Sequence, residues 1–349
     1  MRVRTGRIFL FGVCCLCLAA LTARGAQQPS PALVVRGAGA TFPAPLYKKW
    51  IEVFQRQRPE VRIEYEAVGS GEGIKRFLAG AVDFGASDAA LTDEQMAKAP
   101  YGAQLVPATA GIVVLAYNLP GVSGGLKLSR ETLVDLVAGR IQTWDDARIK
   151  RDNPGQNLPH LTIALVVRQD GSGTTFALTN HLSVVSTAWR DRGPGVGTLI
   201  EWPGAPMMAV GNEGVAARIK QSVGAIGYIE YHFAHRLGLP MARLQNKAGN
   251  FIEPSEHAGQ QTLASNLGQI PANLRVFLPD PDGEESYPIL TLTWVLVHER
   301  YPDREKATIL KAFLHWGLTE GQSFSRDLGY IPLPEDVAAL SRTAVSRLP

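Results

Sequence analysis

Residues 163–175 read Ile-Ala-Leu-Val-Val-Arg-Gln-Asp-Gly-Ser-Gly-Thr-Thr. The apolar run Ile163–Val167 predicts a short buried strand, and the glycines after Asp170 predict a tight turn. A helix is expected from Thr174, where a hydroxyl residue follows the turn. A strand, a glycine-bearing turn and a helix in this order indicate an α/β fold.

The same order recurs along the chain. An expected strand at 32–36 leads through a glycine-rich turn to a helix at 43–58, and a strand at 61–68 leads through another such turn to a second helix. A late strand at 288–297 is followed by an amphipathic helix at 304–317. The sequence therefore predicts an α/β fold with a largely parallel sheet, and not a β-sandwich or a helical bundle.

Residues 1–26 differ in composition from the rest of the chain. Three arginines precede a nearly uncharged apolar run from Ile8 to Ala23, and the small residues Gly25 and Ala26 follow it. This order is typical of a secretory signal peptide that is cleaved near residue 25 or 26. A membrane anchor is the alternative, but the run is short for the roughly 20 residues that span a bilayer.

The composition excludes several classes of protein. The 349 residues include 35 Lys and Arg, 32 Asp and Glu and 45% hydrophobic residues, which is a globular composition. Removal of residues 1–26 takes away four arginines and no acidic residue, which leaves 31 basic and 32 acidic residues. The remaining chain is therefore nearly neutral, and its charge gives no argument for a nucleic-acid partner. All three cysteines, Cys14, Cys15 and Cys17, lie in that segment, and none follows the small residue that a lipoprotein signal requires. The mature chain is expected to be exported and soluble, without a disulfide or a cysteine-ligated metal.

Four glycine-bearing turns precede expected helices, at residues 37–42, 69–73, 170–174 and 211–214. Glycine lets the backbone approach a ligand closely, and the free N–H groups at a helix start favour an anion. Hydroxyl side chains in or near the turns are Thr41, Ser70, Ser87, Ser172 and Thr174. Each hydroxyl alone is more typical of a helix cap, but several of them together suggest an anion site.

The pair Arg168 and Asp170 adds a cation to the third turn. The planar fork of donors on arginine fits a tetrahedral oxyanion, and Asp170 could hold that fork in orientation. An ordinary surface ion pair beside a turn is the alternative, and spacing alone does not decide between the two.

Asp88 follows the expected strand 82–86 and is unexpected near an anion, because a carboxylate repels a fully ionised ligand. Its presence is explained if the ligand carries a proton, since the carboxylate then accepts a hydrogen bond from P–OH. Phosphate retains a proton near neutral pH and sulfate does not, so a buried acceptor would discriminate against sulfate.

Six segments together resemble the periplasmic phosphate-binding proteins of bacterial phosphate ABC transporters. They are GAGATFPAPLYKKW (37–50), VDFGASDA (82–89), TWDD (143–146), RQDGSGTT (168–175), GNEGVAA (211–217) and GAIGYIEY (224–231). The resemblance covers essentially the whole mature chain. It implies a type II periplasmic-binding-protein fold, in which two α/β lobes are joined by two crossovers near residues 115 and 287, with a ligand cleft between them. The implied lobes are residues 32–115 with 288–349, and residues 116–287.

The resemblance also implies a function and a binding site. The function is high-affinity binding of inorganic phosphate by a periplasmic monomer, which delivers it to the permease and ATPase subunits of an ABC transporter. No catalysis, metal or cofactor is implied. The implied phosphate ligands are Thr41, Phe42 through its N–H, Ser70, Asp88 as proton acceptor, Arg168 as the one cation, Ser172, Gly173 and Thr174, with Asp170 as the partner of Arg168.

The second turn departs from the family pattern, which often has a further serine and glycine after the matching Ser70. Here Gly71 removes a potential hydroxyl and Glu72 adds a charge beside the anion site. A Glu72 side chain that points to solvent would be harmless, whereas one that points inward would weaken binding and make it pH-dependent.

An exported phosphatase or esterase is the main alternative function. Its possible nucleophiles are Ser70, Ser87 and Ser172, but none of these three lies in a G-x-S-x-G motif, and neither a P-loop lysine nor a dinucleotide fingerprint is present. The pair His232 and His235 is more typical of packing than of a zinc site. A binding protein for another oxyanion or a sugar phosphate and a structural surface protein are further alternatives, and saturable binding without turnover would separate a binding protein from an enzyme.

Overall fold

The computed structural model of the protein describes residues 33–266, 268, 271 and 273–349. The predicted signal peptide lies outside these residues. Contacts join Leu33–Pro349 into one compact unit. Among the described helices, none combines the length and the apolar character needed to cross a membrane.

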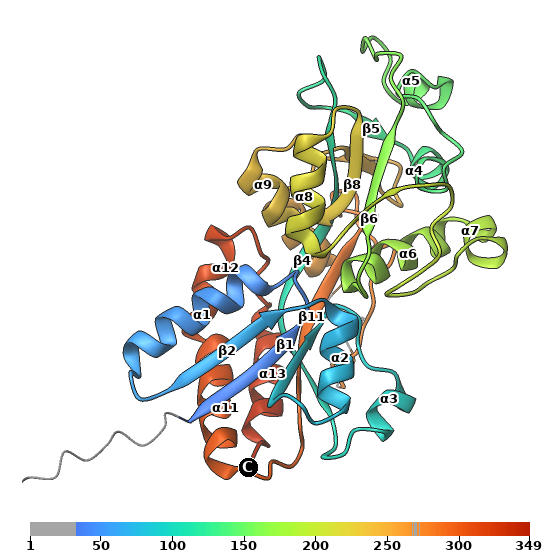
Figure 1. Ribbon diagram of the computed structural model, residues 1–349. Helices are drawn as coiled ribbons and strands as arrows, with labels where there is room; N and C mark the ends of the chain where they lie inside the picture. Colours follow the sequence, from blue (N-terminus) through green and yellow to red (C-terminus); the bar gives the residue numbers. More distant parts are fainter. Residues whose placement is uncertain (1–32, 267, 269–270, 272) are drawn as a thin grey trace, which may run out of the picture. The chain divides into compact units, whose positions relative to one another are not determined.

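A mixed sheet of eight strands forms the centre of this unit, in the order β2-β1-β3-β11-β4-β8-β6-β7 (Figure 1). Its strands are β1 (Val34–Gly39), β2 (Arg62–Ala67), β3 (Phe84–Ser87), β4 (Gln104–Asn118), β6 (Ala164–Arg168), β7 (Met207–Ala209), β8 (Ala225–Glu230) and β11 (Leu290–Val297). The α/β fold is therefore as predicted. β1 pairs in parallel with β2 and β3, and β6 with β7 and β8, but β11 and β4 are antiparallel to their neighbours. The predicted largely parallel sheet is wrong for these middle strands, because an apolar run does not encode the direction in which a strand arrives.

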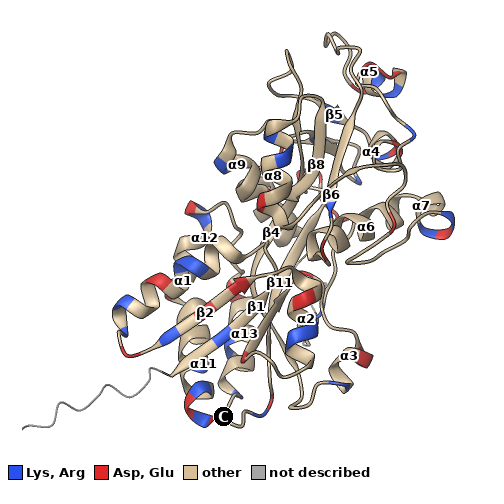
Figure 2. Ribbon diagram, viewed as in Figure 1, with Lys and Arg blue, Asp and Glu red and all other residues tan. Residues whose placement is uncertain are grey.

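β4 connects two groups of strands. Its residues Gln104–Ile112 pair with β11 and its residues Val113–Asn118 pair with β8. We call β2, β1, β3 and β11 with their helices the β1 side, and β8, β6 and β7 with their helices the β6 side. β4 and β11 contain no charged residue (Figure 2), as expected of strands that are covered on both faces. The division into lobes at residues 115/116 and 287/288 stays a prediction.

Helices pack against the strands of both the β1 side and the β6 side. Packed on the β1 side or on β4 are α1 (Ala44–Gln57), α2 (Ser70–Leu78), α11 (Arg304–Gly317) and α13 (Glu335–Ser346). Packed on the β6 side are α6 (Gly173–Val185), α8 (Gly211–Gln221) and α9 (Tyr231–Leu237). The other helices are α3 (Asp93–Ala97), α4 (Arg130–Val137), α5 (Ala147–Asp152), α7 (Thr187–Arg192), α10 (Glu256–Ser265), the 3₁₀ helix η2 (Glu320–Ser323) and α12 (Phe324–Asp327). A small second sheet consists of β10 (Phe251–Ile252), β9 (Arg243–Gln245) and β5 (Lys127–Leu128).

The first helix packs against the last part of the chain. Trp50 in α1 is 1% exposed, and its indole N–H donates to the carbonyl of Gly321 over 2.8 Å. The rings of Phe54 and Phe313 lie 5.4 Å apart, centre to centre, which joins α1 to α11. The apolar residues Leu46, Trp50 and Phe54, at helical spacing in α1, are therefore buried, and α11 returns to the β1 side.

Candidate anion site between the two sides of the sheet

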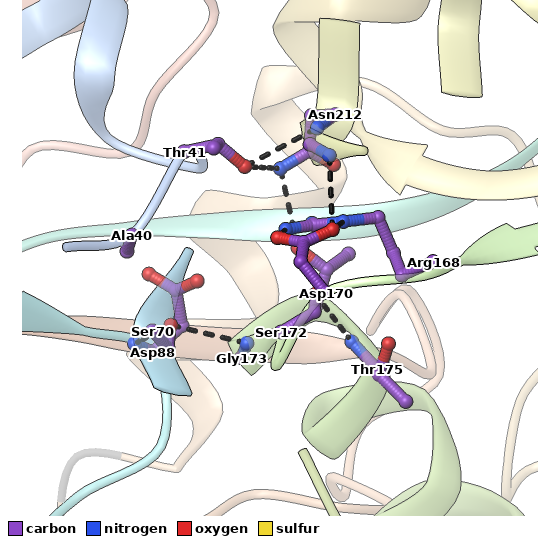
Figure 3. Close-up of polar contacts among 12 residues, drawn as sticks. Ala40, Thr41, Ser70, Asp88, Arg168, Asp170, Ser172, Gly173, Thr175 and Asn212 are labelled. Atoms are coloured by element: carbon purple, nitrogen blue, oxygen red, sulfur yellow. Dashed lines mark hydrogen bonds and ion pairs between the residues drawn. The ribbon is translucent and has the colours of Figure 1, made fainter. Parts of the chain in front are cut away.

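The predicted glycine-bearing turns meet where the β1 side contacts the β6 side (Figure 3). The N–H of Gly71 donates to the carbonyl of Gly171 over 2.9 Å, and the N–H of Asn212 donates to Oγ1 of Thr41 over 3.2 Å. These contacts bring the starts of α2, α6 and α8 and the turn before α1 to one place. Because the first N–H groups of a helix lack partners within it, this convergence favours an anion.

Asp88 follows β3 and is 1% exposed. Its Oδ1 accepts a hydrogen bond from Oγ1 of Thr293 in β11 over 2.7 Å. Burial raises the pKa of Asp88 to about 7, while the hydrogen bond of Thr293 and the charge of Arg168 act in the opposite direction. A carboxylate in this buried position is stabilised by groups that donate to it, so Asp88 is suited to accept a hydrogen bond from a protonated oxyanion.

Arg168 ends β6 and is 2% exposed, which excludes the surface ion pair left open by its spacing. Its Nε donates to Oδ1 of Asp170 over 2.7 Å, and its Nη2 donates to Oδ2. Asp170 also accepts from the N–H of Gly211 at the start of α8 over 3.0 Å. Burial alone would raise the pKa of Asp170, but Arg168 and this N–H lower it, so the carboxylate stays charged. Asp170 thus orients Arg168, whose Nη1 makes no hydrogen bond to any described residue.

Ser70 and Gly173 connect the starts of α2 and α6. Ser70 is 1% exposed, and its Oγ accepts from the N–H of Gly173 over 3.1 Å and from the N–H of Asp88 over 3.3 Å. With both hydrogen bonds arriving at its oxygen, the Ser70 hydroxyl retains a proton to donate.

Thr41 and Phe42 lie in the turn before α1. The Thr41 hydroxyl accepts from the backbone N–H and from Nδ2 of Asn212. Phe42 is fully buried, and its carbonyl accepts from the hydroxyl of Tyr330 over 2.6 Å. Its N–H makes no hydrogen bond within the described part of the chain, so it is free to bind a ligand, as the resemblance implies.

Ser172 and Thr174 are fully buried at the start of α6. The Oγ of Ser172 accepts from the N–H of Thr175 over 3.1 Å, so this serine is the helix cap that its position also suggested. Thr174 accepts from Nδ2 of Asn212 over 3.3 Å. The structure therefore brings the predicted ligands together.

Sequence reasoning missed Asn212, Thr293 and Glu230. Asn212 lies in the fourth glycine-bearing turn, at residues 211–214, so its position in the sequence already indicated a place near the site. Thr293 lies in an apolar strand with no such signal. Glu230 ends β8 fully buried, and burial raises its pKa well above its usual range, although its carboxyl accepts from the N–H of His232 over 3.0 Å.

Glu72 pairs with its own helix rather than with the site. It binds Nε of Arg76 over 2.9 Å and lies 3.6 Å from Nζ of Lys75, and the bond from Arg76 lowers its pKa. His232 bonds the carbonyl of Leu328 over 2.8 Å, as a packing residue does. Among the described residues, no three His, Cys, Asp or Glu side chains are grouped as a metal site.

Comparisons with known proteins agree with this arrangement. Residues 25–320 match the family model described as "PBP superfamily domain". The phosphate-binding protein PstS of Pasteurella multocida is 39% identical over 310 residues, which cover 88% of each chain. The phosphate-binding protein PstS of Methanocaldococcus jannaschii is 38% identical over 344 residues, which cover 92% of this chain and 88% of the relative.

Solved structures show the same fold. A phosphate-binding protein from Stenotrophomonas maltophilia has a TM-score of 0.71 at 20% identity, over 89% of this chain and 94% of that one. A phosphate ABC transporter substrate-binding protein from Clostridium perfringens with bound phosphate has a TM-score of 0.62 at 18% identity, over 86% of this chain and all of that one. The chain therefore belongs to the PBP superfamily and, within it, to the PstS family of phosphate-binding proteins.

Proposed function

We propose that this chain binds inorganic phosphate between the β1 side and the β6 side of its sheet and delivers it to an ABC transporter. The observation that carries the proposal is Asp88, a buried carboxyl that accepts from Thr293 and lies against Gly173 at the start of α6, among the other predicted ligands. The proposed ligands are Thr41, Phe42, Ser70, Asp88, Arg168, Ser172 and Thr174. The predicted donor of Gly173, its N–H, donates to Oγ of Ser70 instead, so Gly173 is proposed to position Ser70.

The donors and the acceptor have different tasks in this proposal. Hydroxyls, the N–H of Phe42 and the guanidinium of Arg168 donate to phosphate oxygens, and a P–OH group donates to Asp88. Sulfate has no proton to offer near neutral pH, so it would place an oxygen against an ionised carboxylate. The resulting uncompensated charge disfavours sulfate.

Binding is proposed to hold the two sides together. The lobes would be residues 32–115 with 288–349 and residues 116–287, joined by the crossovers near residues 115 and 287, and phosphate would stabilise the closed form because it needs donors from both. The transporter's permease and ATPase subunits would receive phosphate from that form. Residues 1–26 would direct export to the periplasm, where the protein would act as a monomer without a metal or cofactor. It would not be an enzyme, since the named relatives are binding proteins.

The test is a calorimetric titration of the mature protein after unfolding and refolding, which removes bound ligand. At about pH 8, where Asp88 is mostly ionised, saturable one-to-one binding of phosphate with no response to sulfate is expected. Equal binding of sulfate would remove the role of Asp88 in selectivity, and absence of binding to both would overturn the proposed function. Recovery of unchanged phosphate monoesters after long incubation would separate binding from hydrolysis.

A further inference from the structure

Asn212, the second residue of α8, is fully buried and bonds to both sides of the sheet (Figure 3). Its Nδ2 donates to Oγ1 of Thr41 over 3.0 Å and to Oγ1 of Thr174 over 3.3 Å, and its backbone N–H donates to the same Thr41 oxygen over 3.2 Å. Thr41 belongs to the β1 side and Thr174 to the β6 side, so one amide connects two proposed phosphate ligands.

The orientation of the Asn212 amide follows from a fourth hydrogen bond. Its Oδ1 accepts the backbone N–H of Glu230 over 3.0 Å. A backbone N–H can only donate, so the amide oxygen faces Glu230 and the NH₂ group faces the two threonines.

This orientation determines what the threonine hydroxyls can do. A hydroxyl has two acceptor positions and one proton. The Thr41 oxygen already accepts two N–H groups, so both of its acceptor positions are filled and its hydroxyl can act toward a ligand only as a donor. The Thr174 oxygen accepts one N–H, which orients this hydroxyl but leaves one acceptor position open. A hydroxyl held as a donor suits a ligand made of oxygen acceptors.

We propose that Asn212 is a positioning residue, which fixes the Thr41 hydroxyl as a donor toward the bound oxyanion, orients the Thr174 hydroxyl beside it and connects the two sides in the closed form. The inference rests on the proposed function, because it assigns those donors to phosphate. Asn212 itself does not contact the ligand in this account.

The test is a double-mutant cycle measured by phosphate calorimetry on the refolded mature protein. Hydrogen bonds to a charged group are worth enough for N212A and T41V each to weaken phosphate binding about 10-fold or more. Because Asn212 acts partly through the Thr41 hydroxyl, the double variant should bind far more tightly than the product of the two losses predicts. Independent, multiplying losses would overturn the inference, and so would an N212A variant with unchanged affinity.

The variant N212L separates positioning from space filling. Leu has a branched outline like that of Asn, but it can neither donate to the Thr41 oxygen nor accept from the N–H of Glu230, and it adds no charge beside the anion. The inference predicts that N212L loses at least as much affinity as N212A, whereas a space-filling role predicts that N212L stays close to the wild type.

A matched control is N153A, because Asn153 is also a buried asparagine bonded to backbone groups, at Lys127 and Ile149, in another part of the fold. Phosphate affinity should be unchanged in N153A, and thermal unfolding without ligand checks that each variant is folded. A wild-type chain that does not bind phosphate removes the proposed function and this inference together, whereas phosphate binding by the wild type with N212A unaffected removes only the inference.

Discussion

The hydroxyl oxygen of Ser70 lies 3.1 Å from the backbone nitrogen of Gly173, although the two residues are 103 positions apart in the sequence. Ser70 begins α2 on the β1 side and Gly173 begins α6 on the β6 side. A Cβ atom on Gly173 would lie 2.5 Å from Cβ of Asp88 and 2.7 Å from Oγ of Ser70. The close contact between the two sides seen here therefore requires glycine at this position.

The variant Gly173→Ala is expected to bind phosphate roughly 10- to 100-fold more weakly, since an added methyl group in a close-packed site costs about 1–3 kcal/mol. Calorimetry measures the loss, and the melting temperature of the ligand-free protein should change little if an open form relieves the overlap. Gly124→Ala is the control, because nothing lies within 4 Å of a Cβ at Gly124. Equal affinities for Gly173→Ala and the wild type would contradict this account of closure.

The variant Asp88→Asn should lose discrimination between phosphate and sulfate. A neutral amide no longer repels sulfate, so sulfate binding should become measurable while phosphate binding weakens. Competition titrations give the ratio of the two affinities. The control is Asp135→Asn, which removes a carboxylate that pairs with Arg140 and Arg148 rather than with groups of the site. This variant should leave the ratio of affinities unchanged. An unaltered ratio in Asp88→Asn would show that Asp88 does not accept the phosphate proton.

Sulfate binding by the wild type should depend on pH. The pKa of Asp88 is raised to about 7, so the carboxyl is protonated below that pH and can donate to sulfate, and it is ionised and repels sulfate above it. We expect the affinity for sulfate to fall as the pH rises from about 6 to about 8. The same titrations with Asp88→Asn should show a much flatter profile, and parallel profiles would assign the pH dependence to another group.

Removal of the buried cation Arg168 should weaken the binding of every oxyanion. Arg168→Ala takes away the guanidinium that Asp170 orients, and removing one partner of a buried, hydrogen-bonded charge pair between protein and ligand costs about 2–5 kcal/mol of binding energy. We expect at least a 100-fold loss of phosphate affinity in calorimetry, at that scale of energy. Arg148→Ala, which breaks ion pairs to Asp135 and Asp146, is the control. Retained affinity in Arg168→Ala would remove Arg168 from the ligand set.

His181 in α6 should make the fold less stable in acid. It is fully buried, its Nδ1 bonds the carbonyl of Pro279 over 2.6 Å, and burial lowers its pKa from 6.5 to about 4. The unfolded chain takes up this proton at a higher pH than the folded chain does. The contribution to stability is therefore complete above pH 6.5 and is lost as the pH falls toward about 4, by an amount on the order of 3 kcal/mol.

Urea unfolding at several pH values checks this contribution by comparing variants. His181→Gln should lose less stability between neutral and acidic pH than the wild type, while His160→Gln, at an 83% exposed side chain, should behave like the wild type. The comparison between variants is needed because Asp88 has the opposite effect on stability. Its pKa is raised to about 7 in the folded chain, so its protonation stabilises the fold as the pH falls. Identical acid dependence in His181→Gln and the wild type would assign the effect elsewhere.

Much of the fold could be predicted because its signals are local. The predicted helix 304–317 matches α11, and the predicted helix 43–58 contains α1, because apolar residues at helical spacing mark the buried face of each. The direction of β11 and the change of partner within β4 could not be predicted, since a buried strand has the same apolar composition whichever way it runs.

The candidate site was predicted in part for the same reason. Its glycines and hydroxyls lie in short turns that are visible in the sequence, and Asp88 and Arg168 stand out as charges beside apolar strands. Thr293 was missed because one threonine in a buried strand looks like any other. The direction of Glu72 was left open, because helical spacing permits a bond to Arg76 but does not require it.

The sequence by itself determined the α/β class, the four turns that converge on the site and the charged groups placed in them, because backbone conformation and burial follow from the pattern of neighbouring residues. Only the tertiary structure decided that Ser70 would meet Gly173, that Thr293 would bond Asp88 and that Asn212 would connect Thr41 to Thr174. Each of these contacts joins residues far apart in the chain, and each depends on the packing of every element between them.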